Sequence, residues 1–189
     1  DEFAINSLTK AQAAIKDGLF DGEITPVTYS TRKGEVTVDT DEQPGKARLD
    51  KIPQLRAAFK KDGTITAANS SSISDGAAAL ILMRENEAKA KGLQPLARVM
   101  GHTTHSQAPS EFTVAPIGAM NSLLGKLDWT KDDVDLWEIN EAFAMVTMAA
   151  MDELKLDHAK VNIEGGACAL GHPVGCSGAR ILITLINSL

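Results

Sequence analysis

Hydrophobic residues recur at helical spacing at the start of the chain, at Phe3, Ala4, Leu8, Ala11, Ile15 and Leu19. This period predicts an amphipathic helix over the first twenty residues, with its apolar stripe facing a core and Gly18 near its end. The pattern then changes to alternation of apolar and polar residues, which predicts two strands at 23–29 and 35–38. A polar turn at 31–34 separates them.

The middle of the chain has fewer regular patterns. Residues 39–46 are acidic and contain Pro44-Gly45, so we expect a loop there. Apolar positions between 49 and 59 predict a further short helix. Residues 66–76, TAANSSSISDG, are small and rich in hydroxyl groups and follow neither period. Such a run is either a solvated linker or the wall of a pocket, and the pattern leaves both open.

From residue 77 onward, predicted strands and helices alternate. The strands are expected at 77–83, 96–101, 134–139 and 161–163, and the helices at 85–91, 117–127, 141–154 and from 179 onward. This order is typical of the α/β class, with a mostly parallel sheet flanked by helices. The apolar run at 77–83 is expected to be a buried strand. Functional residues in such sheets gather at the carboxyl ends of strands, so Asn140 and the loop carrying His172 should share one edge.

Composition excludes several classes of protein. The 189 residues contain 43% hydrophobic and 23% charged residues, as is usual for a globular chain of one domain or two small ones. A net charge of -6 and an aromatic content of 4% argue against nucleic-acid binding. No apolar run is long enough to predict a membrane span. Only two cysteines are present, which indicates a reducing compartment, and we expect a cytoplasmic protein.

A glycine-rich loop follows the apolar run at 161–163 and carries His172 between Gly171 and Pro173. Glycines allow positive φ angles and close approach of other groups, so the loop is suited to bring a ligand against the backbone. A neutral histidine there could act as a general base, or it could simply bond to a carbonyl within a tight connection. The spacing of Cys168, His172 and Cys176 also resembles a zinc site, but a fourth ligand is missing and we expect no metal.

Asn140 follows the strand predicted at 134–139 directly. It could be only the N-cap of the next helix. That interpretation does not explain Glu138 and Glu141, which flank it at an otherwise apolar strand end. A carboxamide in this position could instead hold a water molecule or an oxyanion.

Three motifs in order resemble the thiolase family, which includes acetyl-CoA acetyltransferases and 3-ketoacyl-CoA thiolases. They are TAANSSSISDGAAA at 66–79, NEAFA at 140–144 and GGACALGHPVGCSGARIL at 165–182. The resemblance covers essentially the whole chain. It implies the layered thiolase fold, present here only in part. Residues 1–73 would be the remainder of the loop domain, which binds coenzyme A, and residues 74–189 a truncated C-terminal domain.

The resemblance implies Claisen condensation or thiolytic cleavage of acetoacetyl-CoA or a longer 3-ketoacyl-CoA, through an acyl-cysteine intermediate. His172 would activate the nucleophilic cysteine, and Asn140 would hold a water that completes an oxyanion hole with it. Coenzyme A would be a substrate, with no further cofactor. Residues expected to line the substrate site are Ala67, Ser71, Ile73, Phe112, Ala142 and Phe143. Phe112 departs from the methionine of many members, and Gly45-Lys46 stands where many have an arginine.

The family's two catalytic cysteines lie outside these residues, and Cys168 and Cys176 match neither, so we interpret both as packing residues. We therefore expect the chain alone to be inactive and to belong to a longer parent, whose targeting signal could lie elsewhere. The resemblance implies a homodimer or homotetramer for that parent. Two alternatives remain: a non-catalytic module that binds coenzyme A or a partner, and a condensing enzyme of the ketoacyl synthase or HMG-CoA synthase type.

Overall fold

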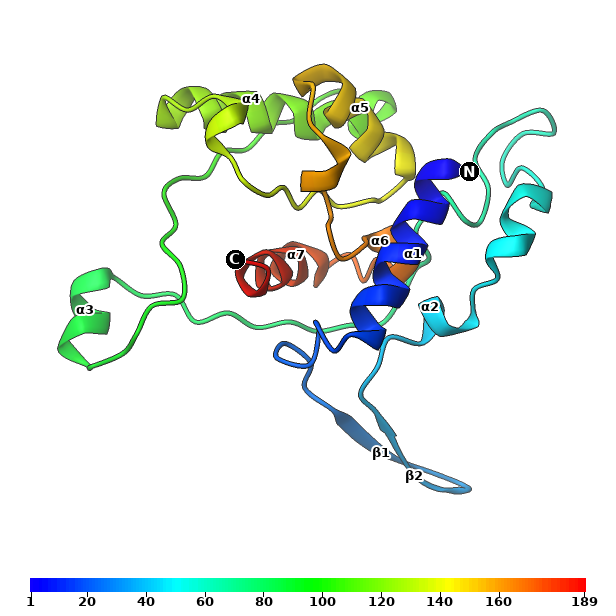
Figure 1. Cartoon of the computed structure of the whole chain (residues 1–189), viewed down its shortest axis with the longest axis horizontal. Helices are drawn as coiled ribbons and strands as arrows, with labels where there is room; N and C mark the ends of the chain where they lie inside the picture. The colour runs from blue at the N-terminus through cyan, green and yellow to red at the C-terminus, as the bar shows by residue number, and fades with distance from the viewer.

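The computed structural model describes residues 1–189 and is mainly helical (Figure 1). Its longer helices are α1 (Glu2–Lys16), α4 (Ala115–Leu127), α5 (Ala144–Leu154) and α7 (Ser177–Asn187). Shorter ones are α2 (Glu42–Lys46), α3 (Glu85–Ala90), α6 (Ala167–Leu170) and the 3-10 turns η1 (Leu49–Gln54), η2 (Pro109–Val114), η3 (Lys131–Asp133) and η4 (His158–Lys160). The only sheet is the antiparallel hairpin of β1 (Val27–Thr31) and β2 (Gly34–Val38).

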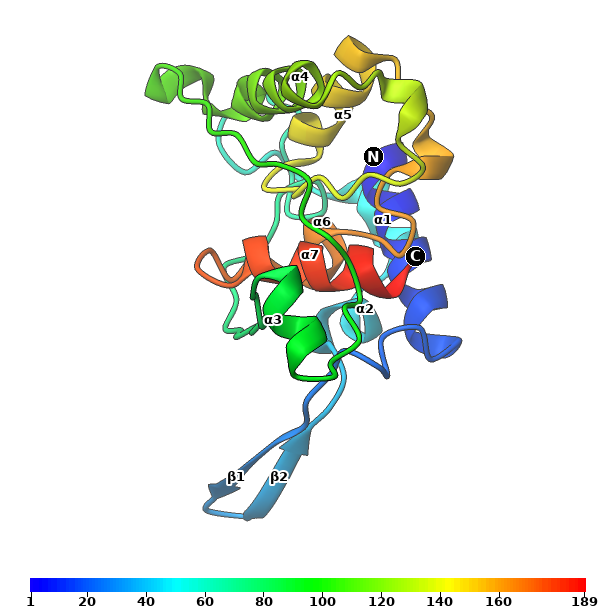
Figure 2. The same cartoon turned by 90° about the vertical axis from the view of Figure 1, so that its left-hand side faces the viewer.

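The amino-terminal pattern is confirmed. α1 buries Phe3, Ala4, Leu8 and Ala11, the stripe that the helical period predicts, and Gly18 follows with φ of 72°. The hairpin pairs Val27 with Val38 and Thr31 with Gly34, so the polar turn lies where alternation places it. Both strands are exposed throughout, and the hairpin projects from the body in two perpendicular views (Figures 1 and 2).

Two local predictions are wrong. The acidic loop predicted at 39–46 contains the short helix α2, because Pro44 lies within its first turn, where a missing amide costs no helical hydrogen bond. The helix predicted over 49–59 is instead the 3-10 turn η1, which holds Pro53 and ends at Gln54. A proline cannot donate the amide hydrogen bond that an α-helix would require at that point.

The strands predicted from residue 77 onward do not form a sheet within these residues. Parallel pairing is reduced to isolated bridges between Trp137 and Val161 and between Ile73 and His172. Residues 77–83 are extended but largely exposed, not the buried strand that their apolar side chains predict. A strand, unlike a helix, needs neighbours to satisfy its backbone groups, and these segments have none in the chain.

Two small clusters of buried side chains hold the body together. One joins Leu8 and Ala11 of α1 to Ile52 and Ala169, and the other joins Ile139, Ala150 and Val161. α4 and α5 lie side by side, while α1 packs against α6 (Figure 1). The loop that carries His172 connects α6, which packs against α1, to α7.

Candidate active site

The hydroxyl-rich segment at 66–76 lies directly against the His172 loop. The backbone N–H of His172 donates to the carbonyl of Ser72 at 2.9 Å, and Ile73 forms a parallel bridge with His172. Gln43 of α2 donates through its side-chain amide to the hydroxyls of Ser72 and Ser74. The segment is thus one wall of the region around His172, which excludes the solvated-linker interpretation.

Hydrogen bonds set the tautomer of His172. Its Nδ1 lies 2.6 Å from Oγ of Ser177, the first residue of α7, and that hydroxyl donates to the carbonyl of Pro173 at 3.1 Å. A hydroxyl has one hydrogen, so Ser177 accepts a hydrogen bond from Nδ1–H. Nε2 then carries a lone pair, which accepts a hydrogen bond from Nδ2 of Asn140 at 3.4 Å. His172 is therefore oriented as a base through Nε2.

Asn140 is not a helix cap. α5 begins at Ala144 with Phe143 as its N-cap, three residues later than the predicted start of the helix. The amide oxygen of Asn140 is buried and has no hydrogen-bond partner within the chain. Its side chain is thus available for a substrate or a water molecule. The predicted approach of Asn140 and His172 is present in the structure, although the two residues are separated by 31 others in the sequence.

Glu141, one of the two glutamates that flank Asn140, has a structural role. Its side chain is 1% exposed and accepts hydrogen bonds from Ser7 Oγ at 2.7 Å, Asn162 Nδ2 at 2.8 Å and the backbone N–H of Cys168 at 3.0 Å. A Cβ at Gly166 would collide with this carboxylate, so glycine is required there. Glu141 thus ties α1, the chain at residue 162 and α6 to the end of the Asn140 segment. Sequence reasoning noticed this glutamate but not its role.

Glu138, on the other side, belongs to a buried acidic group beneath α7. Its side chain is 5% exposed, and its Oε2 lies 3.8 Å from Nη1 of Arg180. Burial raises the pKa of Glu138 to about 8, because Arg180 only partly offsets the loss of solvation and Glu141, Glu164 and Glu23 add negative charge. Burial also raises the pKa of Glu164 and that of Glu23. At neutral pH Glu138 therefore holds a bound proton.

Four other residues predicted to line the substrate site form two contacts in the structure, one between Ser71 and Ala142 and one between Phe112 and Phe143. Ser71 bonds to the carbonyl of Ala142 through both its backbone N–H, at 3.2 Å, and its hydroxyl, at 2.9 Å. The rings of Phe112 and Phe143 lie 6.2 Å apart, and Phe59, which sequence reasoning counted only as an apolar position of a predicted helix, lies 6.4 Å from Phe143. These contacts bring the three motifs to one region and place an aromatic group at its margin.

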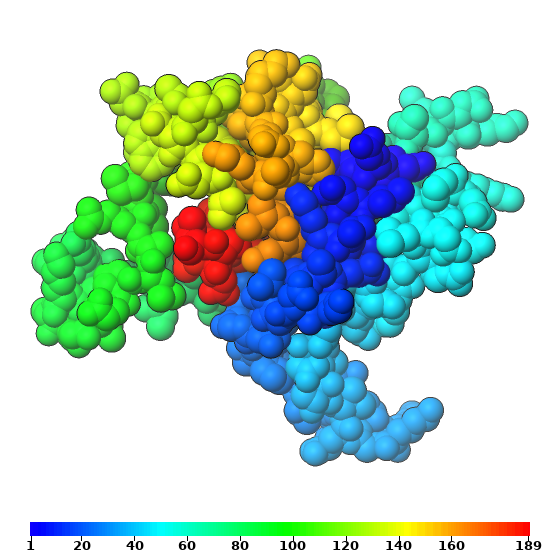
Figure 3. Space-filling model, in the orientation of Figure 1, coloured from blue at the N-terminus to red at the C-terminus, as the bar shows by residue number.

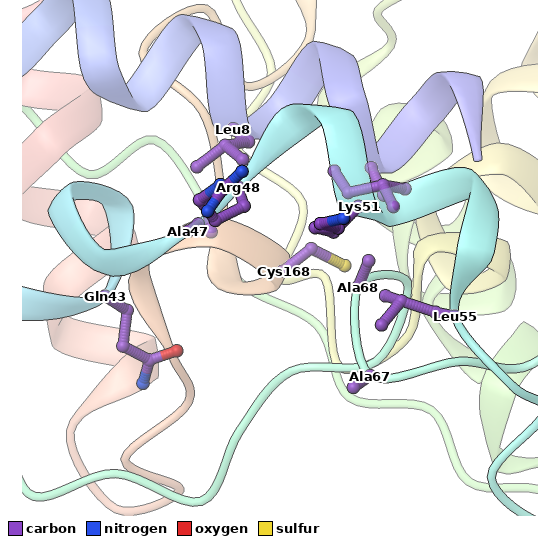
Figure 4. Close-up of a pocket in the computed structure, with 12 residues that line it drawn as sticks. Leu8, Gln43, Ala47, Arg48, Lys51, Leu55, Ala67, Ala68 and Cys168 are labelled. Carbon is purple, nitrogen blue, oxygen red and sulfur yellow. The ribbon is translucent and has the colours of Figure 1, made fainter.

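A cavity of about 270 Å³ opens next to this region and is lined mainly by hydrophobic side chains (Figure 4). Ala67, Ala68, Leu8, Leu55 and Cys168 of α6 contribute apolar surface to it. Arg48 and Lys51 also line it, although the sequence pattern did not single them out. Ile73 does not, because its side chain is 97% exposed. An apolar cavity with two cations suits a ligand that is partly hydrophobic and partly anionic.

The two cysteines are free and are not placed for reactivity. Burial, together with the nearby Glu141 carboxylate, raises the pKa of the Cys168 thiol, so it stays protonated at neutral pH. Cys176 is buried. The structure brings together no set of three or more His, Cys, Asp or Glu side chains suited to a metal ion, which argues against the zinc interpretation. None of the helices combines the length and the apolar character needed to cross a membrane.

Family models match nearly all of the chain. "Thiolase, N-terminal domain" matches residues 1–86, and "Thiolase, C-terminal domain" matches residues 93–189. The chain belongs to the thiolase family.

Related sequences and solved structures lead to the same family. The chain is 47% identical over 189 residues to an acetyl-CoA acetyltransferase of Yarrowia lipolytica, covering all of this chain and 48% of the relative. It resembles the crystal structure of the Bacillus anthracis acetyl-CoA acetyltransferase with a TM-score of 0.96 and 46% identity, over 100% of this chain and 48% of that one. A thiolase from Ascaris suum in complex with coenzyme A gives a TM-score of 0.89 and 39% identity, with the same coverage.

The predicted fold class is confirmed by these structures as part of the α/β thiolase fold. The chain spans about half the length of the relatives it matches. Its extended segments therefore follow the path of the matching segments in a longer chain, although they have no strand partners among these residues.

Proposed function

We propose that this chain supplies the histidine–asparagine half of a thiolase active site. A complete enzyme built on it would condense or cleave acetoacetyl-CoA or a longer 3-ketoacyl-CoA through an acyl-cysteine intermediate. The observation that carries the proposal is the placement of Asn140 Nδ2 3.4 Å from His172 Nε2, with the other ring nitrogen held by Ser177. Membership of the thiolase family and relatives named acetyl-CoA acetyltransferase support it.

The geometry suits two successive tasks for His172. In the tautomer that Ser177 enforces, Nε2 accepts the proton of a cysteine thiol, and the resulting thiolate attacks the thioester carbonyl. The protonated Nε2–H is then a donor that faces the same region, where negative charge develops on the carbonyl oxygen. Asn140 adds polarity beside it, either directly or through a water bound to its amide. Removal of one such donor typically lowers the rate by on the order of 100-fold or more.

The cavity next to the pair supports coenzyme A as a substrate. Its apolar walls at Ala67, Ala68 and Leu55 suit a pantetheine arm, and Arg48 and Lys51 suit phosphate groups. Arg48 already pairs with Asp50 at 2.9 Å, so Lys51 is the cation without an ion pair in the structure. The structure of the Ascaris suum thiolase in complex with coenzyme A supports the same ligand class.

The experiment uses a chimera in which these 189 residues replace the matched segment of the Bacillus anthracis acetyl-CoA acetyltransferase. At 46% identity and a TM-score of 0.96, the segment should fit the rest of that chain. We expect the chimera to cleave acetoacetyl-CoA in the presence of coenzyme A. We expect the 189 residues alone to show no turnover, because the thiol of Cys168 stays protonated and Cys176 is buried.

One specific observation favours a second candidate, a non-catalytic module that binds coenzyme A. The cavity carries Arg48 and Lys51, while neither cysteine is placed to act as a nucleophile. Calorimetric titration of a folded chimera with coenzyme A, together with the assay for acetoacetyl-CoA cleavage, distinguishes the enzyme from the non-catalytic module. Binding of coenzyme A without cleavage of acetoacetyl-CoA would favour the module, whereas binding with cleavage supports the enzyme.

A further inference from the structure

Asn162 is a buried residue, 2% exposed, whose side chain hydrogen-bonds on both sides of Asn140. Its Oδ1 accepts from the backbone N–H of Ile139 at 2.8 Å, and its Nδ2 donates to the carbonyl of Ile139 at 2.8 Å. The same Nδ2 donates to Oε1 of Glu141 at 2.8 Å. Ile139 and Glu141 are the two neighbours of Asn140 in the sequence, so one side chain holds the backbone before Asn140 and the carboxylate after it.

Two requirements select asparagine at position 162. The backbone there has φ of 44°, a left-handed conformation that asparagine adopts more readily than most residues other than glycine. The N–H of Ile139 can only donate and its carbonyl can only accept, so the side chain must offer both an acceptor and a donor. Aspartate has no donor when ionised, and glycine has no side chain. Asparagine satisfies the backbone and the hydrogen bonds together.

The same hydrogen bonds extend to the loop that carries His172. Glu141, which accepts from Asn162, also accepts from the backbone N–H of Cys168 in α6, and α6 leads directly into His172. In the space-filling view, the chain that leads into α6 (orange) is packed between α1 (blue) and the segment after α4 (yellow-green) (Figure 3). Asn162 therefore links the segment that carries Asn140 to the one that carries His172.

The contact between Asn140 and His172 depends on this support. A hydrogen bond of 3.4 Å from Nδ2 of Asn140 to Nε2 of His172 is long, and too weak to fix the amide by itself. The place of the amide is therefore set by the backbone on either side, which Asn162 holds. A misplacement of about 1 Å in an active site can lower the rate by about 100-fold.

We propose that Asn162 is a positioning residue of the active site, whose side chain sets the place of Asn140 opposite His172 by holding Ile139 and Glu141. The inference rests on the proposed function, because it assigns the residue that orients one half of that site. Asn162 acts through Asn140 and does not itself contact the substrate.

The direct test observes the contact by NMR in the 189-residue chain, as a nuclear Overhauser effect between the amide protons of Asn140 and the ring protons of His172. The wild type should show the effect, because the two nitrogens lie 3.4 Å apart. Asn162→Gly removes all three hydrogen bonds, while glycine accepts the left-handed backbone without strain. We expect this variant to keep its helical content by circular dichroism and to lose the effect.

A second variant and a matched control complete the test. Asn162→Asp keeps the side-chain volume and an acceptor for the N–H of Ile139, but it has no donor for the carbonyl and adds a carboxylate beside Glu141. It should lose the effect as well, and it replaces Asn162→Gly if that variant does not fold. Thr184→Val removes the hydrogen bond from the buried Thr184 to Glu23, at 3.0 Å, and touches neither neighbour of Asn140. This control should lower the urea midpoint but keep the effect.

Kinetics of the chimera give the second readout. Asn162→Gly should lower kcat for cleavage of acetoacetyl-CoA by about 10- to 100-fold with a much smaller change in KM, because no residue that lines the cavity bonds to Asn162. Thr184→Val should keep both constants within about twofold of the wild type.

Two results would overturn the proposal. One is a contact between Asn140 and His172 that persists in both Asn162 variants, and the other is an equal loss of the contact in Thr184→Val, which would make it a consequence of lower stability alone. The NMR contact requires no turnover. An inactive wild-type chimera would therefore refute the proposed function, while the contact would still decide the role of Asn162.

Discussion

At the scale of single residues, the sequence was sufficient to select His172 and Asn140 but not to predict the tautomer of His172. The motifs that carry the two residues pointed to one site, and the structure places their side chains 3.4 Å apart. The tautomer of His172 depends on Ser177 and on the carbonyl of Pro173, which only the folded loop brings into position. Arg48 and Lys51 were missed, because isolated cations carry no periodic signal, and Phe59 was counted only as an apolar position of the helix predicted over 49–59.

Ser177 gives a prediction at this scale. In the chimera, Ser177→Ala removes the group that accepts from Nδ1–H, so the ring loses its preference for the tautomer with an unprotonated Nε2. We expect kcat for cleavage of acetoacetyl-CoA to fall by about 10- to 100-fold, with a smaller change in KM. Ser177→Thr keeps a hydroxyl and should retain most of the rate. Equal rates for wild type and Ser177→Ala would show that Ser177 does not orient the base.

At the scale of elements, most of the longer helices and the hairpin were predictable, and the strands after residue 77 were not. α1, α3 and α4 lie where the period places them, because a helix satisfies its backbone within one segment. The predicted strands after residue 77 have the expected apolar side chains, yet their pairing depends on residues elsewhere. Short elements such as α6 were missed, since four residues are too few to show a period.

Glu141 should stabilise several elements at once. Glu141→Gln replaces one carboxylate oxygen with an NH2 group, which would face donors from Ser7 and Cys168 or from Asn162. A buried mismatch of this kind costs about 1–3 kcal/mol, so the free energy of unfolding in urea should fall by about that amount. Glu153→Gln, on an exposed position of α5, is the control and should leave stability unchanged. A Glu141→Gln variant as stable as the wild type would remove Glu141 from this role.

The acidic group beneath α7 predicts a dependence of stability on pH. The pKa of Glu138 is about 8 in the folded chain and about 4.5 for an ordinary glutamate, so between these values the folded state binds more protons than the unfolded state. The free energy of unfolding should therefore decrease as pH rises from about 4.5 to about 8 and change little above that. Glu138→Gln carries no titrating group at this position. Its free energy of unfolding should therefore fall by roughly 1–3 kcal/mol less than that of the wild type over this pH range.

Urea unfolding of both proteins at several pH values measures this effect. Glu87→Gln, on the exposed face of α3, serves as the control and should follow the wild-type curve. A wild-type stability that rises steadily between pH 5 and 8 would contradict a protonated Glu138 in the folded chain.

At the scale of the whole molecule, the chain brings His172 and Asn140 together but places no reactive cysteine beside them. It covers 48% of the length of the Yarrowia lipolytica and Bacillus anthracis acetyl-CoA acetyltransferases, and its extended segments after residue 77 form no sheet among themselves. The sequence pattern predicted an α/β fold of this family. It could not show that 77–83 is exposed, because burial of a central strand is a property of the complete fold.

The most direct measurement is the burst of acyl-enzyme formation when the chimera is mixed with acetoacetyl-CoA. The wild-type chimera should give a burst, which reports attack of a cysteine thiolate on the thioester. His172→Ala should abolish it while leaving the circular dichroism spectrum and the binding of coenzyme A intact, because in the proposed mechanism Nε2 is the base that forms the thiolate. A burst of unchanged rate and amplitude in His172→Ala would contradict the account.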